Sequence, residues 1–203
     1  MLVKRLLACA AFLLALAAPA GASRIYKMEV RGPIFTPVLQ YLTIALEQAE
    51  RGGADALLLE LDTPGGSLDT TKDIVQAILG ASVPVIVYVA PSGAGATSAG
   101  TFMTLAAHVA AMAPGTTIGA AHPVSLLPSD KPNETMEKKV ENYAVSFIEA
   151  IAAQRGRNVA WAAEAVRARS TSSSPIRAWW LRVSSAPSAS CWGRSASPSC
   201  LST

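Results

Sequence analysis

The chain has 203 residues, 51% of them hydrophobic, and a formal net charge of +3. That length allows one sizeable core and favours a single domain. Between residues 23 and 168, fourteen acidic residues face eleven basic ones, so the positive charge comes from the two ends and does not indicate nucleic-acid binding. All three cysteines, Cys9, Cys191 and Cys200, lie at those ends, which leaves none for a disulfide framework or a metal site in the core.

The first 22 residues have the order of a secretory signal peptide. A basic start precedes an apolar run from Leu6 to Ala18, and small residues in A-x-A order follow it. The apolar run is shorter than the ~20 residues that a membrane-spanning helix needs. We therefore expect cleavage near Gly21 or Ser23 and an exported mature protein.

Between the ends, strand-like and helix-like segments alternate, which favours a mostly parallel sheet with helices packed on it. We expect Thr36, Ser67 and Asn158 to cap helices, because hydroxyl and amide side chains before an apolar helical pattern are typical N-caps. The pattern predicts strands at 24–30, 56–61 and 83–89 and two very short strands around a turn at Pro114–Gly115. It predicts helices at 36–52, 68–80, 98–107, 134–156 and 159–167.

The segment 91–97, "PSGAGAT", is a glycine loop between a buried strand and a helix. A dinucleotide site would need a third glycine where Ser98 stands and an acidic residue about 20 positions later, and both are missing. No P-loop motif occurs. The two histidines, His108 and His122, have no carboxylate or second histidine at ligand spacing. We therefore expect no cofactor and no metal.

A second glycine loop, "LDTPGGSLDT" at 61–70, also follows a buried strand and precedes a helix. The two loops would lie side by side at the carboxyl ends of their strands and form a cleft. Backbone N–H groups of Gly65 and Gly66 could stabilise an oxyanion there, and Ser98 could act as a nucleophile. The alternatives are that the glycines only form a turn and that Ser98 is only a helix cap.

Four segments together resemble the ClpP/crotonase-fold serine proteases of the NfeD type, the membrane-associated partners of stomatin-like proteins. The segments are "LDTPGGSLDTTKDIV", "VPVIVYVAPSGAGATSAGTFM", "HVAAMAPGTTIGAAHPV" and "KKVENYAVSFIEAIAAQRGRN", and the resemblance covers residues 24–167. It implies an α/β fold of repeated β-β-α and βαβ units, a homo-oligomer, and a substrate drawn from hydrophobic segments of stomatin-like membrane proteins.

The resemblance also implies which residues act. Ser98 matches the family's nucleophile and Lys139 its general base, while the N–H groups of Gly66 and Ala99 match its oxyanion donors. A lysine takes a proton only when it is neutral, which requires burial to lower its pKa. Lys139 shares a helical stripe with Tyr143 and Phe147, so we expect it to lean toward the buried edge.

Two further residues, Lys138 and His122, affect the choice of the general base. Lys138, the neighbour of Lys139, aligns with polar residues and is expected to face solvent. His122 lies 24 residues after Ser98, close to the spacing of the catalytic histidine in cytosolic ClpP proteases, and is the alternative base. The third member of such a triad would be an acid such as Asp130.

From Arg169 onward the sequence changes character and the resemblance ends. Residues 169–203 contain twelve serines and no Asp, Glu or Lys, which suggests a shifted reading frame or a natural disordered tail. We expect a signal peptide at 1–22, a protease domain at 23–168 that is incomplete at its C-terminus, and an anomalous tail. Two other functions remain open: an inactive crotonase-fold interaction protein, and an acyl-group enzyme that uses the same oxyanion pocket without a nucleophile.

Overall fold

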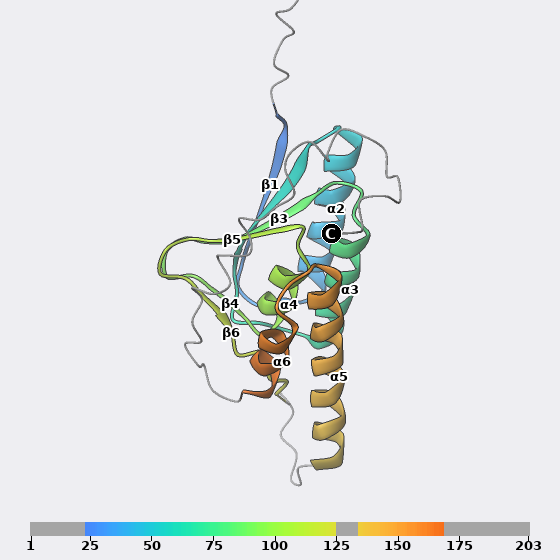
Figure 1. The fold of residues 1–203 in the computed structure, drawn as a ribbon. Helices are drawn as coiled ribbons and strands as arrows, with labels where there is room; N and C mark the ends of the chain where they lie inside the picture. Colours follow the sequence, from blue (N-terminus) through green and yellow to red (C-terminus); the bar gives the residue numbers. More distant parts are fainter. Residues whose placement is uncertain (1–22, 125–133, 169–203) are drawn as a thin grey trace, which may run out of the picture.

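The computed structural model describes residues 23–124 and 134–168, and the larger of its two sheets is parallel throughout (Figure 1). The sheet confirms the expectation from the alternating segments. Its third strand begins at Val85 instead of Val83, because Pro84 between them has no N–H to donate to a ladder. The strands lie in the order β1 (Ile25–Arg31), β2 (Ala56–Asp62), β3 (Val85–Val89) and β5 (Val109–Met112).

A second, two-stranded parallel sheet lies beside the first and consists of β4 (Gly95–Thr97) and β6 (Thr117–Gly119). The prediction of a loop at 91–97 was wrong in its second half, because distant backbone groups supply the hydrogen bonds that make β4 a strand. Thr63 pairs with Ala96 from one side and β6 pairs from the other. The two short strands flanking Pro114–Gly115 therefore belong to different sheets.

Helices cover one side of the larger sheet (Figure 1). Ser67 and Asn158 cap α3 and α6 as predicted, accepting hydrogen bonds from the N–H groups of Thr70 and Trp161. Thr36 is not the cap of α2, because Phe35 is the extended residue before that helix and Thr36 is already helical. The helices are α2 (Thr36–Arg51), α3 (Leu68–Gly80), α4 (Ala99–Ala106), α5 (Glu134–Gln154) and α6 (Val159–Arg167).

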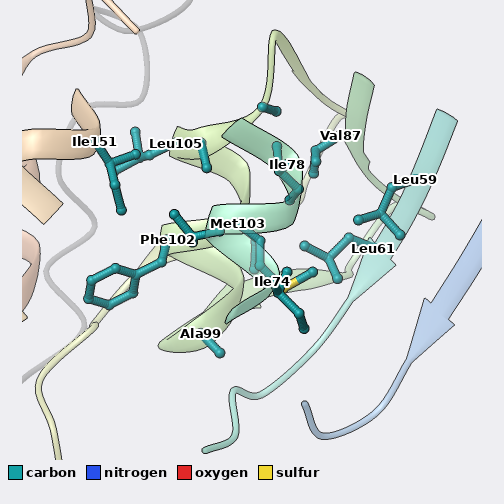
Figure 2. Close-up of a cluster of buried hydrophobic side chains, with 14 of the residues drawn as sticks. Leu59, Leu61, Ile74, Ile78, Val87, Ala99, Phe102, Met103, Leu105 and Ile151 are labelled. Atoms are coloured by element: carbon teal, nitrogen blue, oxygen red, sulfur yellow. The ribbon is translucent and has the colours of Figure 1, made fainter. Parts of the chain in front are cut away.

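The core holds α4 at the centre of the molecule. Every residue of α4 is buried, and its side chains meet those of β2, α3 and α5 (Figure 2). Burying one large aliphatic or aromatic side chain stabilises a fold by about 1.5–3 kcal/mol, so this cluster fixes the position of α4 firmly. The members of this cluster that Figure 2 labels are Leu59, Leu61, Ile74, Ile78, Val87, Ala99, Phe102, Met103, Leu105 and Ile151.

Two arginines after α5 hold the C-terminal end of α4. Arg157 donates from Nε to the carbonyl of Leu105 (2.9 Å) and from Nη2 to that of Ala107 (2.8 Å). Arg155 donates from Nε to the carbonyl of Ala106 (2.7 Å). Burial, with the nearby charge of Arg155, lowers the pKa of Arg157 to about 10. Cations are favourable where helix carbonyls lack partners, so the two side chains anchor this end of α4.

Candidate active site

Ser98 stands at the turn between β4 and α4. Its φ of 50° and ψ of −114° are rare for a residue with a side chain. Hydrogen bonds to a distant segment stabilise this conformation, because the Ser98 N–H donates to the carbonyls of both Gly119 (3.4 Å) and Ala120 (3.3 Å). The side chain is partly exposed and makes no cap hydrogen bond to α4. The alternative that Ser98 serves only as a helix cap is therefore wrong.

The glycine loop after β2 lies directly against Ser98. A Cβ on Gly65 would come within 2.5 Å of the Ser98 Cβ and 3.0 Å of its Oγ, and Gly65 has a φ of +121°. Gly66 forms a parallel bridge with Ile34 and has no room for a side chain beside the Ile34 backbone. The two predicted glycine loops are thus neighbours, as expected from their places at the carboxyl ends of adjacent strands.

The amides of this loop have different partners. The Gly65 N–H donates to Thr63 Oγ1 at 3.0 Å. In the bridge with Gly66, Ile34 bonds to the Gly65 carbonyl and to the Ser67 N–H, so the N–H of Gly66 points away from Ile34. Gly66 is exposed, and its N–H donates to no acceptor within residues 23–124 and 134–168.

Ala99 supplies a second free amide. It is the first residue of α4, where an N–H has no acceptor inside the helix. No backbone or side-chain acceptor for it occurs elsewhere in the described part of the chain. Gly66, which follows the Gly65 that contacts Ser98, and Ala99, which follows Ser98 in the chain, therefore both keep an N–H group available. Free N–H groups beside a nucleophile can stabilise negative charge on a carbonyl oxygen.

Lys139 lies in the first turns of α5 and its side chain is exposed, as is that of Lys138. The expectation that Lys139 leans toward a buried edge was wrong, because α5 is buried only from Ala144 onward and its first turns extend beyond the other described elements (Figure 1). Among the described residues, Lys139 has no hydrogen bond or ion pair with Ser98.

The aromatic part of the predicted stripe does form. Phe147 stacks on Phe102 of α4 with ring centroids 5.6 Å apart, and Tyr143 stacks on Phe147 at 6.0 Å. These contacts join α5 to α4 and extend along α5 toward Lys139. The structure therefore connects the helix of the predicted base to the helix of the predicted nucleophile without bringing the two side chains together.

His122 lies two residues beyond the carbonyl of Ala120, which contacts the Ser98 amide. Its Nδ1 is 3.0 Å from the carbonyl of Val166 at the end of α6. Since a carbonyl can only accept, Nδ1 carries the proton in this contact and Nε2 keeps its lone pair in the neutral ring. No hydrogen bond joins His122 to Ser98 in the described residues, and Asp130 lies outside them.

Thr63 was not recognised from the sequence. It is buried beneath the glycine loop and bonds to both Gly65 and β4. Its position between a buried strand and a Pro-Gly-Gly turn is the one signal that could have singled it out. The described residues contain no group of three His, Cys, Asp or Glu side chains placed to hold a metal ion.

The sequence profile of a protein family described as "NfeD1b, N-terminal domain" matches residues 24–176, past Arg169 where the resemblance was expected to end. Residues 169–203 and 1–22 lie outside the described structure. Membrane-bound protease PH1510 of Pyrococcus horikoshii is 38% identical over 163 residues, 80% of this chain and 37% of that protein. Membrane protein NfeD1b of Bacillus subtilis is 28% identical over 145 residues, 71% of this chain and 31% of that protein. The chain thus spans about a third of the length of these relatives.

Solved structures of 1510-N, a membrane-bound stomatin-specific protease of P. horikoshii, have a similar fold. A serine-to-alanine mutant is 36% identical with a TM-score of 0.66, covering 71% of this chain and 70% of that one. A lysine-to-alanine mutant in complex with a substrate peptide is 37% identical with a TM-score of 0.65, covering 72% and 67%. ClpP1 of Listeria monocytogenes, 15% identical with a TM-score of 0.59 over 75% and 86%, shares the fold. The fold is therefore ClpP-like.

Proposed function

Because the chain belongs to the family of the NfeD1b N-terminal domain, we propose that it is a serine endopeptidase whose nucleophile is Ser98 and whose base is Lys139. Gly66 and Ala99 donate the hydrogen bonds that stabilise the oxyanion. The observation that carries this proposal is the setting of Ser98. Its hydroxyl does not cap α4, and the N–H groups of Gly66 in the adjacent loop and of the following Ala99 have no acceptor in the described part of the chain.

The reaction follows from that arrangement. Ser98 Oγ attacks the carbonyl carbon of the scissile peptide bond while its proton passes to the base. The carbonyl oxygen becomes negatively charged and is stabilised by the N–H groups of Gly66 and Ala99, each worth roughly 10²–10³ in rate in comparable sites. The protonated base then gives its proton to the leaving amine, and an acyl ester remains on Ser98. Water, deprotonated by the same base, hydrolyses that ester.

Support for Lys139 comes from the relatives. In 1510-N the substituted serine and lysine are as far apart in sequence as Ser98 and Lys139 are here. The exposed position of Lys139 adds a requirement, because a lysine must be neutral to accept a proton and burial favours its neutral form. The proposal therefore requires that a bound substrate or a second subunit covers the first turns of α5 during catalysis, which agrees with a homo-oligomer.

His122 is the second candidate for the base, giving a Ser–His peptidase. The hydrogen bond from Nδ1 to Val166 favours it, since it orients the ring and leaves Nε2 as the proton acceptor. In Ser–His sites a carboxylate has this orienting role, and here a backbone carbonyl would replace it. Separate substitutions of Lys139 and His122 distinguish the two candidate bases.

The relatives also support a proposal for the substrate class. The 1510-N protease is specific for a stomatin homologue, and both curated relatives are membrane proteins. We propose that this chain acts outside the cytoplasm at a membrane, on hydrophobic segments of a stomatin-like protein. No helix among the described residues is long and apolar enough to cross a bilayer.

Replacement of Ser98 by alanine tests the proposal. Ser98→Ala should abolish cleavage of a short apolar peptide and labelling by a fluorophosphonate, while the free energy of unfolding changes by less than about 0.5 kcal/mol because no cap bond is lost. Ser92→Ala, in the exposed part of the same loop, is the matched control and should keep both activities. Cleavage that survives in Ser98→Ala would refute the assignment, and a wild-type chain that neither cleaves nor labels would support the inactive alternative.

A further inference from the structure

Thr63 lies at the junction of the two loops that form the candidate site. It directly follows β2, and only 1% of its surface is exposed. A buried threonine hydroxyl is costly unless it is hydrogen-bonded, so its partners show where the fold uses it. Those partners lie on both sides of the site.

The hydroxyl of Thr63 contacts the glycine loop. Oγ1 accepts the N–H of Gly65 at 3.0 Å and lies 3.3 Å from the Gly65 carbonyl, to which it can donate. Gly65 is therefore held at both of its backbone polar groups. The Gly65 carbonyl also accepts the N–H of Ile34 at 2.8 Å. Because the peptide that follows Gly65 carries the N–H of Gly66, Thr63 and Ile34 together set the direction of the proposed oxyanion donor.

The backbone of Thr63 contacts the strand that leads to Ser98. The N–H of Thr63 donates to the carbonyl of Gly95 at 2.7 Å. The carbonyl of Thr63 accepts hydrogen bonds from the N–H of Thr97 at 3.1 Å and from Thr97 Oγ1 at 3.0 Å. Its methyl group packs against Gly100 in the first turn of α4, where a Cβ would come within 2.6 Å of it. Thr63 thus connects the glycine loop, which carries the proposed oxyanion donor, to β4 and α4, the two elements that flank Ser98.

We propose that Thr63 is a positioning residue of the peptidase site: its hydroxyl holds Gly65 so that the N–H of Gly66 faces the oxyanion formed at Ser98. This inference rests on the proposed function. It separates two parts of the side chain, because the hydroxyl would serve catalysis through Gly66 and the methyl group would serve only packing.

A pair of variants separates these roles. Thr63→Val keeps the shape and the methyl group but removes the hydroxyl, and Thr63→Ser keeps the hydroxyl but removes the methyl. We expect kcat for an apolar peptide to fall about 10–100-fold in Thr63→Val with KM little changed, as for a misplaced catalytic group. Thr63→Ser should recover most of that loss. The control is Thr104→Val, which removes a different buried hydroxyl, that of a residue within α4. This variant should cleave the peptide with the kcat of the wild type.

Hydrogen exchange of the glycine amides tests the same inference without activity. In the full wild-type chain the amide of Gly65 should exchange slowly and that of Gly66 fast, and in Thr63→Val the Gly65 amide should lose its protection. Normal turnover in Thr63→Val, or an equal loss in Thr63→Ser, would overturn the positioning role. If the wild type does not cleave peptide, the proposed function fails, and a Gly65 amide that exchanges equally fast in wild type and Thr63→Val would overturn this inference as well.

Discussion

The side chain of Ser98 occupies the space that the missing side chain of Gly65 leaves open, since a Cβ on Gly65 would lie 2.5 Å from the Ser98 Cβ. The two residues come from different loops and are brought together by the ends of β2 and β4. Ser98 can therefore keep this position only because residue 65 has no side chain.

Replacing Gly65 by alanine should therefore abolish peptide cleavage and fluorophosphonate labelling. The new methyl group would displace Ser98, and the φ of +121° would add backbone strain of about 1–3 kcal/mol. Activity and urea unfolding, measured on the same samples, separate the two effects.

Gly32→Ala is the matched control for that strain. Gly32 has a similar φ of +109°, but no atom of the described residues lies within 4 Å of the position that a Cβ would take there. It should lose comparable stability and keep its activity per folded molecule. If both variants lose activity equally, the contact between Gly65 and Ser98 is not what matters.

Three variants decide between the two candidate bases. If Lys139 is the base, Lys139→Ala should remove cleavage and labelling, while Lys138→Ala and His122→Ala should retain them. The measurements are kcat/KM for the peptide and the extent of fluorophosphonate labelling in each variant. Loss of turnover in His122→Ala with an intact Lys139→Ala would assign the site to the Ser–His class.

The arginine anchor of α4 should contribute more to stability than a surface ion pair. Arg157→Met would leave the carbonyls of Leu105 and Ala107 without its hydrogen bonds, and we expect a loss of about 2–4 kcal/mol. The comparison is Arg51→Met, which breaks an exposed i,i+4 pair with Glu47 and should cost at most about 0.5 kcal/mol. Equal midpoints of urea unfolding in the two variants would contradict the anchoring role.

Features decided by neighbouring residues in the sequence were predictable. Ser67 and Asn158 cap their helices as expected, because a cap bond spans only three residues and needs nothing from the rest of the fold. The parallel sheet followed from the alternation of apolar strands with helical patterns. Ser98 and the Pro-Gly-Gly loop could be placed together because the two glycine loops follow β2 and β3, which are adjacent strands of that sheet.

Features decided by distant residues were not predictable in this way. The strand β4 exists because Thr63 and β6 offer hydrogen bonds to a small-residue segment with no β pattern of its own. The exposure of Lys139 depends on how far α4 reaches along α5, which helical spacing does not encode. Thr63 itself was missed since its role lies in contacts to Gly65 and Thr97 that only the folded chain brings together.

His108 lies away from the candidate site. Its Nδ1 accepts the N–H of Val85 at 3.1 Å, so the ring must be unprotonated at that nitrogen. Burial, and to a smaller extent the charge of Arg155, holds the pKa of His108 below 6.5. The unfolded chain therefore binds a proton more readily than the folded one, and stability that is fully present above pH 6.5 decreases as the pH falls toward the lowered pKa.

The variant His108→Asn isolates this effect, because an asparagine Oδ1 can accept the same N–H and does not titrate. We expect the wild type to lose stability between pH 7.5 and pH 5 more steeply than His108→Asn does, with the two closest in stability at the upper end of that range. Urea unfolding at three pH values in that range measures the two slopes. Parallel slopes would mean that His108 titrates alike in the folded and unfolded chains, and that its contact with Val85 does not resist protonation.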